Sequence, residues 1–208
     1  MSFWQWYVLA VGAGFLAGPI LLRIALIWRQ ARRDPVRFEP FGTSYGFVQW
    51  MLVVSIAGFG APMALFVFAP ALYAQLPAFA FLQAEPLRQA GAVLSALGVI
   101  VMWLAQSRMG QSWRFGPDRE ETPPLVTEGI FRWVRNPIYL SMLLAGLGIF
   151  LMLPDAMVFA ALVLGVATLN MLARLEEEFL AGVHGASYLD YKRRVGRFLP
   201  RLTVSPRP

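Results

Sequence analysis

The sequence contains a stretch of 45 residues, from 40 to 84, without a single Asp, Glu, Lys or Arg. Such a stretch is typical of a segment that lies in lipid, because an ionisable side chain at the centre of a membrane helix costs about 2.5 to 3.5 kcal/mol. About 20 apolar residues cross the hydrocarbon core as a helix. We therefore expect one span over about residues 47–69, followed by a Pro-rich stretch in or near the membrane interface.

Four further apolar segments have the length of membrane helices or come close to it. They cover residues 3–28, 90–107, 138–153 and 156–173. The last two are separated only by Pro154-Asp155, which predicts a hairpin of two helices. Since the chain is also 58% hydrophobic and only 14% charged, we expect an all-α, polytopic membrane helical bundle of about five transmembrane helices.

The basic side chains sort to one side of this predicted bundle. Residues 29–46, 108–136 and 174–208 hold 16 of the 18 Lys and Arg, whereas the connecting loops 70–87 and 154–155 hold none. By the positive-inside rule the three basic segments are cytoplasmic and the N-terminus is outside. These features predict a multi-pass integral membrane protein in contact with membrane lipids.

The tail of the chain is expected to form an interfacial amphipathic helix. Its apolar face consists of residues spaced three and four apart, which are Tyr188, Tyr191, Val195 and Phe198. The other side is crowded with basic residues, which are Lys192, Arg193, Arg194 and Arg197. This pattern is typical of a helix that lies along the membrane surface.

Two absences limit the chemistry that the chain can perform. It has no Cys and a single His, His184, so disulfides, thiolate nucleophiles, iron–sulfur clusters and His-rich metal sites are excluded, and we expect no metal. The net charge of +6 comes from the basic segments beside the predicted spans. We therefore expect the basic residues to determine topology and to contact anionic lipid, with no nucleic acid as partner.

Arg135-Asn136-Pro137 directly precedes the fourth predicted span. Proline is favourable in the first turn of a helix, and the N-terminus of that helix offers free N–H groups and a partial positive charge. With the guanidinium of Arg135, this arrangement suits a carboxylate or a phosphate. The alternative is a positively charged membrane anchor with a proline start, which is common in membrane proteins.

Glu176-Glu177-Glu178 follows the last predicted span. A carboxylate at this place could hold ribose hydroxyls, an ammonium or a sulfonium, or act as a base. The alternative is a solvated acidic turn that pairs with the basic tail. Hairpin connectivity returns the chain to the face on which residues 125–139 lie, so we expect the two clusters to meet in one buried polar site. Trp113 and Arg114 could close over a ligand there, or serve as an interfacial anchor.

Taken together, these motifs resemble the membrane methyltransferase family of isoprenylcysteine carboxyl methyltransferases, their bacterial relatives and the phospholipid N-methyltransferases. That family carries Leu-Val-x-x-Gly, an aromatic residue, Arg-His-Pro-x-Tyr, a Glu-Glu pair about forty residues later, and a basic-aromatic tail. The corresponding residues here are Leu125-Val126 with Gly129, Phe131, Arg135-Asn136-Pro137-Ile138-Tyr139, Glu176-Glu177, and Tyr188-x-x-Tyr191 followed by Arg197-Phe198-Leu199-Pro200. The resemblance covers roughly residues 105–200.

The resemblance implies that S-adenosyl-L-methionine binds on the cytoplasmic side and that a lipid or prenylated substrate is methylated there. The implied cofactor-binding residues are Leu125, Val126, Gly129, Phe131, Asn136, Pro137, Ile138, Tyr139 and Glu176. We hypothesise that the catalytic residues are Arg135, Arg174 and Glu177. In this hypothesis Arg135 and the helix start hold the cofactor carboxylate, Glu176 holds its ribose or amino group, and Glu177 or Arg174 faces the acceptor.

Two residues depart from the family pattern. Asn136 replaces the common His and cannot titrate, so it cannot be a general base. Leu172 stands where the prenylcysteine enzymes have an Arg that contacts the substrate carboxylate, with Arg174 nearby. Base catalysis, where the acceptor needs it, is therefore expected from Glu176 or Glu177.

The predicted division of the chain follows from the extent of the resemblance. Residues 1–104 are expected to form a transmembrane scaffold and residues 105–208 the cofactor-binding catalytic core with its cytoplasmic helix. Two alternatives stay open from the sequence. One is an NADPH-dependent membrane reductase of sterol-reductase type, which shares related C-terminal motifs. The other is a non-enzymatic membrane interaction protein.

Overall fold

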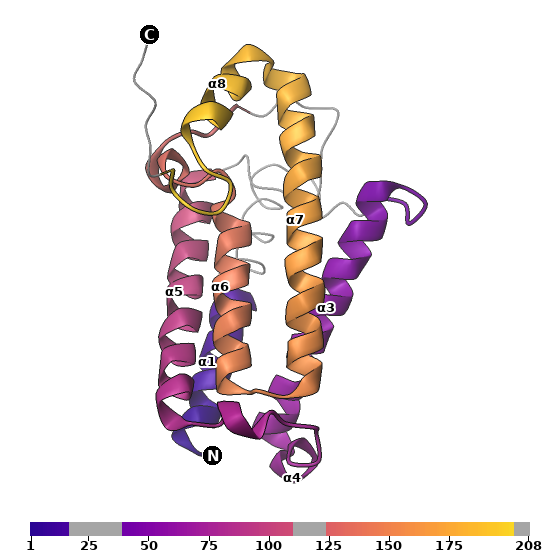
Figure 1. Ribbon diagram of the computed structural model, residues 1–208, viewed down its shortest axis with the longest axis vertical. Helices are drawn as coiled ribbons and strands as arrows, with labels where there is room; N and C mark the ends of the chain where they lie inside the picture. The colour runs from indigo at the N-terminus through magenta and orange to yellow at the C-terminus, as the bar shows by residue number, and fades with distance from the viewer. Residues whose placement is uncertain (17–38, 110–123, 202–208) are drawn as a thin grey trace, which may run out of the picture.

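The protein folds entirely as helices in the parts of the chain that its computed structural model describes, residues 1–16, 39–109 and 124–201 (Figure 1). The long elements are α1 (Phe3–Leu16), α3 (Ser44–Phe68), α5 (Glu85–Met109), α6 (Pro137–Met152) and α7 (Ala156–His184). The short ones are α4 (Pro70–Tyr73), α8 (Ala186–Arg194) and the 3₁₀ turns η2 (Ala80–Leu82) and η4 (Gly129–Arg132). The predicted all-α membrane bundle is confirmed.

Three of the described helices, α3, α5 and α7, are long and apolar enough to cross a membrane, and α6 is a shorter apolar helix. Large apolar side chains on their outer faces, such as Val54, Val93, Ile100 and Val163, are exposed. Such exposure fits a lipid environment and would be unfavourable in water. Of the predicted span over residues 3–28, the structure describes the 14 residues of α1, so the number of passes and their orientation remain predictions.

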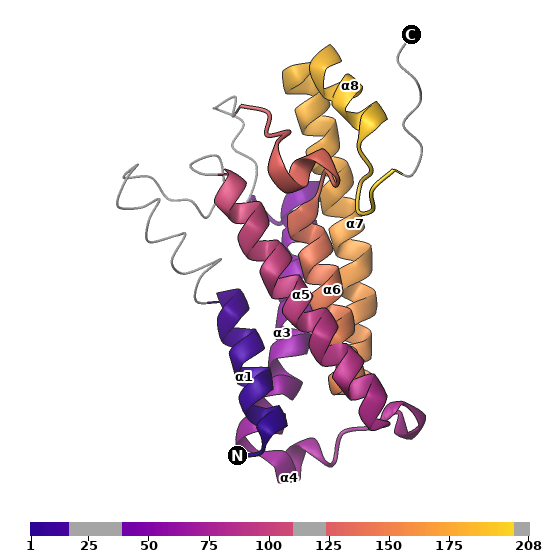
Figure 2. The same cartoon turned by 90° about the vertical axis from the view of Figure 1, so that its left-hand side faces the viewer.

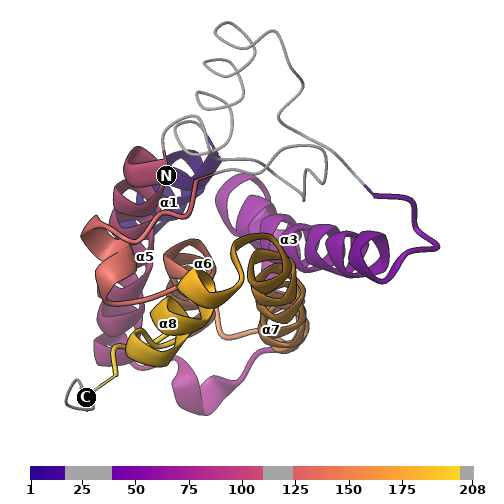
Figure 3. The same ribbon diagram turned by 90° about the horizontal axis from the view of Figure 1, so that it is seen from above.

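The helices alternate in direction along the long axis of the bundle (Figures 1 and 2). α5 and α7 run toward the end that carries α8, whereas α3 and α6 run away from it, and the N-terminus and α4 lie at the opposite end. Seen from above, α8 lies over α6 beside the end of α7 (Figure 3). The end of α7 and the start of α6 therefore meet beneath α8.

Small residues let α5 and α6 approach until their backbones touch. A Cβ added at Gly148 would lie 2.5 Å from the carbonyl oxygen of Gly91 and 2.5 Å from the amide nitrogen of Ser95. A Cβ at Gly98 would lie 2.7 Å from the carbonyl oxygen of Ser141. Packing through small residues replaces the hydrophobic driving force that lipid does not supply. This seam fixes where α6 begins, and with it the site described below.

The predicted hairpin break at Pro154-Asp155 is confirmed. The Asp155 carboxylate caps α7 by accepting hydrogen bonds of 2.9 Å from the amide groups of Met157 and Val158. The predicted second arm ended near residue 173, but α7 continues to His184. The run Glu176–Glu178 is therefore helical, so the alternative interpretation is wrong in making it a turn, although its predicted pairing with the basic tail is confirmed for Glu177.

The tail helix is shorter than the sequence pattern suggests. α8 ends at Arg194, and Val195 has extended backbone dihedrals, so Val195 and Phe198 do not continue the helical face of Tyr188 and Tyr191. Both tyrosines are buried, and with Val195 they form a small core against which partly buried Leu125 packs. The helix is amphipathic as predicted, but its apolar face packs against the protein itself.

The predicted boundary at residues 104/105 falls inside α5. Since α5 packs along α6, one element of the predicted scaffold also supports the predicted core. The division into two parts stays a prediction.

The α5–α6 seam gives a first testable prediction. Gly148→Ala places a methyl group against backbone atoms that cannot move aside, so we expect a loss of about 1 to 3 kcal/mol in the free energy of unfolding. Gly60→Ala is the matched control, because nothing lies within 4 Å of a Cβ at that position. Unfolding of both variants in detergent checks this; equal stability of the two would contradict a close-packed seam.

Candidate functional site

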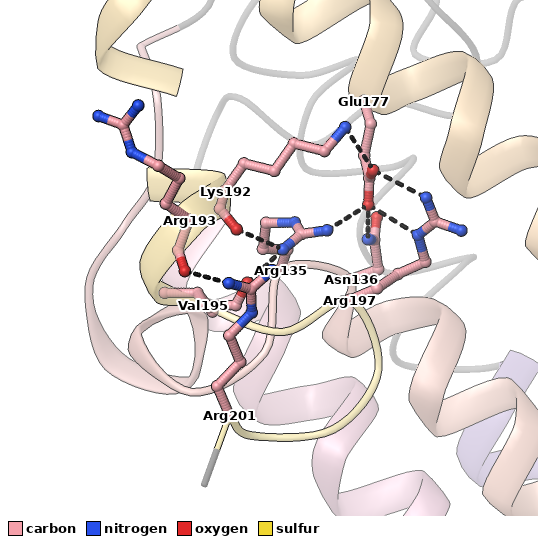
Figure 4. Close-up of polar contacts among 8 residues, drawn as sticks. All are labelled: Arg135, Asn136, Glu177, Lys192, Arg193, Val195, Arg197 and Arg201. Carbon is pink, nitrogen blue, oxygen red and sulfur yellow. Dashed lines mark hydrogen bonds and ion pairs between the residues drawn. The ribbon is translucent and has the colours of Figure 1, made fainter. Parts of the chain in front are cut away.

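Glu177 is the centre of an ion-pair cluster at the α8 end of the bundle (Figure 4). Its side chain is only 2% exposed. Its Oε1 lies 2.9 Å from a guanidinium nitrogen of Arg135 and 2.9 Å from Nε of Arg197, and its Oε2 accepts a second hydrogen bond of 2.9 Å from Arg197. Lys192 Nζ lies 3.2 Å from Oε2. One buried carboxylate thus joins cations from three segments of the chain.

Arg135 and Asn136 tie the start of α6 to the same cluster. The side-chain amide of Asn136 donates a hydrogen bond to Glu177 Oε1 over 3.4 Å. The other guanidinium arm of Arg135 donates to the backbone carbonyl of Lys192 over 3.1 Å and also to that of Val195. The planar guanidinium group of an arginine can donate to several acceptors at once in a fixed geometry, which the ammonium group of a lysine does less well.

The backbone repeats this connection. Val134 and Gly196 form an isolated parallel bridge, in which the Arg135 amide donates to the Gly196 carbonyl over 2.9 Å and the Asn136 amide to the Arg197 carbonyl over 3.1 Å. A Cβ at Gly196 would lie 1.9 Å from the carbonyl oxygen of Leu199. Glycine is therefore required for this turn, which aims Arg197 at Glu177.

The interactions within the cluster shift the pKa values of its ionisable groups. Glu177 lies beyond the apolar stretch of α7, which ends before Arg174. Burial alone would raise the pKa of its carboxyl, but hydrogen bonds from Arg197 and Arg135 outweigh this and lower the pKa to about 2. Conversely, the hydrogen bond to Glu177 raises the pKa of Arg197. The pKa of Tyr188 is raised to about 12, first by burial and then by the charge of Glu177.

The Leu125–Phe131 part of the predicted site packs under α8. The Tyr191 hydroxyl donates to the Phe131 carbonyl over 2.7 Å, and partly buried Leu125 lies against the Tyr188–Tyr191 core. Gly129 has a φ of +61°, and a Cβ there would touch the Arg108 side chain at 3.0 Å. Val126 is partly buried beside Leu125.

Tyr139 and Glu176 lie on the other side of the start of α6. Pro137 is the buried first residue of α6, and half-buried Ile138 accepts a hydrogen bond of 2.6 Å from Ser141 through its carbonyl. One position later, the Tyr139 hydroxyl donates to the carboxylate of Glu176. Glu176 therefore faces the interior between α3, α6 and α7, away from the cations around Glu177.

Arg174 is exposed and lies apart from both glutamates. It lines a groove of about 610 Å³ between the start of α3 and the end of α7. The other lining residues are Phe41, Gly42, Thr43, Ser44, Phe47, Val48, Met171, Leu175 and Glu178. The groove thus combines exposed apolar side chains with hydroxyl groups, one cation and one anion.

The structure brings Arg135, Asn136 and Glu177 into direct contact and places Tyr139 with Glu176, as the two-cluster hypothesis requires. Arg174 does not join either group. Sequence reasoning named the basic tail as a partner of the acidic run in one alternative, but it did not single out Arg197 and Lys192, which it assigned to the polar face of a helix. Trp113 and Arg114 lie outside the described residues. Among the residues that are described, no three His, Asp or Glu side chains gather as metal ligands would.

Residues 87–187 match the phospholipid methyltransferase family. The match covers just under half of the chain, and over these residues the chain is similar to that family. The match runs from the start of α5 into the first residues of α8 and includes Arg135–Tyr139 and both Glu176 and Glu177. The family resemblance predicted from the motifs is confirmed, and it implies a membrane methyltransferase. A search among curated proteins finds no match for the chain.

The buried cluster gives a second prediction. Glu177→Gln keeps the shape of the side chain but leaves Arg135 buried without its counter-charge, so we expect a loss of about 3 to 5 kcal/mol in stability. Asp190→Asn is the matched control, because it breaks an ion pair with Arg193 that is exposed on both sides and costs about 1 kcal/mol at most. Unfolding in detergent measures both; equal losses would remove the central role of Glu177.

The lowered pKa of Glu177 gives a third prediction, on pH dependence. The carboxyl has an ordinary pKa of 4.5 when unfolded and about 2 when folded, so between these values the unfolded chain binds more protons. The stabilisation is complete above pH 4.5 and is lost as the pH falls toward 2. We expect the stability difference between wild type and Glu177→Gln to shrink over this window. A constant difference from pH 6 to pH 3 would contradict it.

Proposed function

We propose that the protein transfers a methyl group from S-adenosyl-L-methionine to a lipid-like or prenylated acceptor at the end of the bundle that carries α8. The observation that carries this proposal is the convergence of the family's motif residues, Arg135–Tyr139 and Glu176–Glu177, at that end. When bound, the donor supplies a methyl group on a positively charged sulfur, which becomes a neutral thioether. The protein contributes binding, alignment and exclusion of water.

The residues at this end fit such a donor. It carries a carboxylate and two cationic groups, so it needs both positive and negative partners. Three cations surround the one carboxylate of Glu177, and two of them, Lys192 and Arg197, remain 42% and 29% exposed. Their excess positive charge suits the donor carboxylate. Glu176, which pairs with no Lys or Arg among the described residues, suits a cationic group.

The contacts favour other roles for Arg135 and Glu177 than the sequence suggested. The outer nitrogens of Arg135 are occupied by Glu177 and two backbone carbonyls, and both oxygens of Glu177 are bound by cations. A carboxylate with a pKa near 2 is a poor base at neutral pH. We therefore propose that both are positioning residues, which hold the tail segment and the start of α6 together.

The acceptor is proposed to approach through the groove at Arg174. Phe41, Phe47 and Met171 on its rim are exposed apolar side chains, as expected for a wall that faces lipid. Its volume of about 610 Å³ lies within the roughly 300–1,000 Å³ of ligand pockets. Alternating helix directions bring the start of α3, the end of α5 and α8 to this end (Figure 1), and in the sequence these three places adjoin the segments richest in Lys and Arg. This supports a cytoplasmic site and an outside N-terminus.

The fourth prediction tests donor binding. Calorimetry with detergent-purified full-length protein is expected to show saturable binding of S-adenosyl-L-methionine that Glu176→Gln weakens by about tenfold or more, the loss of one charged contact. Glu85→Gln, a carboxylate at the opposite end of the bundle, is the control and should bind normally. Binding of NADPH in place of the methyl donor would move the assignment to a reductase. Binding of neither would favour an interaction protein.

A further inference from the structure

Two neighbouring glutamates on α7 have opposite surroundings. Glu177 has three cationic partners within 3.2 Å. Glu176 has no Lys or Arg nitrogen within ion-pair distance in the part of the chain that the structure describes, and its hydrogen-bond partner is the Tyr139 hydroxyl. A carboxylate removed from water needs a compensating charge. Among the described residues, the fold supplies that charge for Glu177 and not for Glu176.

Three helices contribute to the surroundings of Glu176. Tyr139 comes from the first turn of α6 and Tyr45 from the first turn of α3. Tyr45 and Tyr139 both pack on the core formed by Val48 and Leu172, among others. The Tyr45 hydroxyl is close enough to Glu176 and to the Tyr139 hydroxyl to interact electrostatically with each. One carboxylate therefore interacts with the hydroxyl groups of two tyrosines from different helices.

Neither the Tyr45 ring nor the Tyr139 ring is paired with another aromatic ring among the described residues, whereas Tyr188 and Tyr191 pack on each other with ring centroids 6.1 Å apart. Val48 and Leu175 pack with these tyrosines and also line the groove at Arg174. The cluster therefore shares a wall with the groove.

We propose that Tyr45, together with Tyr139 and Glu176, forms a binding site for an onium cation at the reacting centre, either the sulfonium of the methyl donor or an ammonium of the acceptor. Aromatic faces attract such cations through the ring quadrupole, and the carboxylate adds a full opposite charge. The assignment rests on the proposed function. Tyr45 lies outside the family-matched residues 87–187, so it is a specificity residue supplied by the N-terminal part of the chain.

The fifth prediction tests Tyr45 with two probes, S-adenosyl-L-methionine and S-adenosylhomocysteine. They differ by one methyl group and by the positive charge that this methyl group places on the sulfur. Tyr45→Phe keeps the ring, so its affinity for both probes should stay within about twofold of wild type. Tyr45→Leu removes the ring and should weaken binding of the methyl donor by about 5- to 30-fold, with binding of the neutral product unchanged. Calorimetry on the full-length protein in detergent measures the six binding constants, two each for the wild type and the two variants.

A second arm distinguishes the two sources of the cation. Binding of dodecyltrimethylammonium, a single-chain onium lipid, is compared with that of neutral dodecyl maltoside. If the site holds the acceptor ammonium, Tyr45→Leu weakens only the onium lipid and leaves the donor-to-product affinity ratio unchanged. Glu176→Gln, a substitution of nearly equal size, is also expected to weaken binding of the charged probe and not of the neutral one. It is the second variant to measure if Tyr45→Leu folds poorly.

The outcomes separate this inference from the proposed function. Selective loss of either cation supports the onium site. Equal losses for charged and neutral probes indicate that Tyr45 only packs, and no change in any probe removes it from the site; both results overturn the inference while leaving donor binding intact. Failure of the unaltered protein to bind S-adenosyl-L-methionine overturns the proposed function itself.

Discussion

The buried carboxylate of Glu177 and its three cations are the interaction on which this end of the molecule depends. Removing one charge from water is costly, and the cost is recovered only when every partner is in place. Arg135 brings the start of α6, Glu177 brings α7, and Lys192 and Arg197 bring α8 and the segment after it. These elements therefore form as a unit, and the tail of the chain is part of the site.

The packing of the apolar helices positions the elements of that unit. In lipid, α5 and α6 gain nothing from apolar burial and associate through close backbone contact at Gly91, Gly98 and Gly148 instead. The Asp155 cap and the hairpin then hold α7 at a fixed height beside α6. Together these contacts decide that the first turn of α6 and the last turns of α7 lie side by side.

The two adjacent glutamates have separate surroundings because a helix turns by about 100° at each residue. Glu177 points toward α8 and is neutralised by the protein, whereas Glu176 points toward α3 and α6 and meets only tyrosine hydroxyls among the described residues. The family match ends before Lys192 and Arg197 and begins after Tyr45. Parts of the chain outside the matched core thus complete both surroundings.

The sequence by itself determined the class of fold, the position of the hairpin and the family. Uncharged apolar runs leave few alternatives to membrane helices, and motif order is a property of the chain that needs no coordinates. It also brought Arg135, Asn136 and Glu177 into one site, because hairpin connectivity returns residues 125–139 and 176–178 to the same face. Only the tertiary structure decided which side chains contact each glutamate. Arg197 contacts Glu177 through a turn at Gly196, and Tyr45 approaches Glu176 from a helix about 130 residues earlier in the chain. Such long-range contacts leave no periodic signal in a sequence, since they depend on how helices pack and not on how residues are spaced along them.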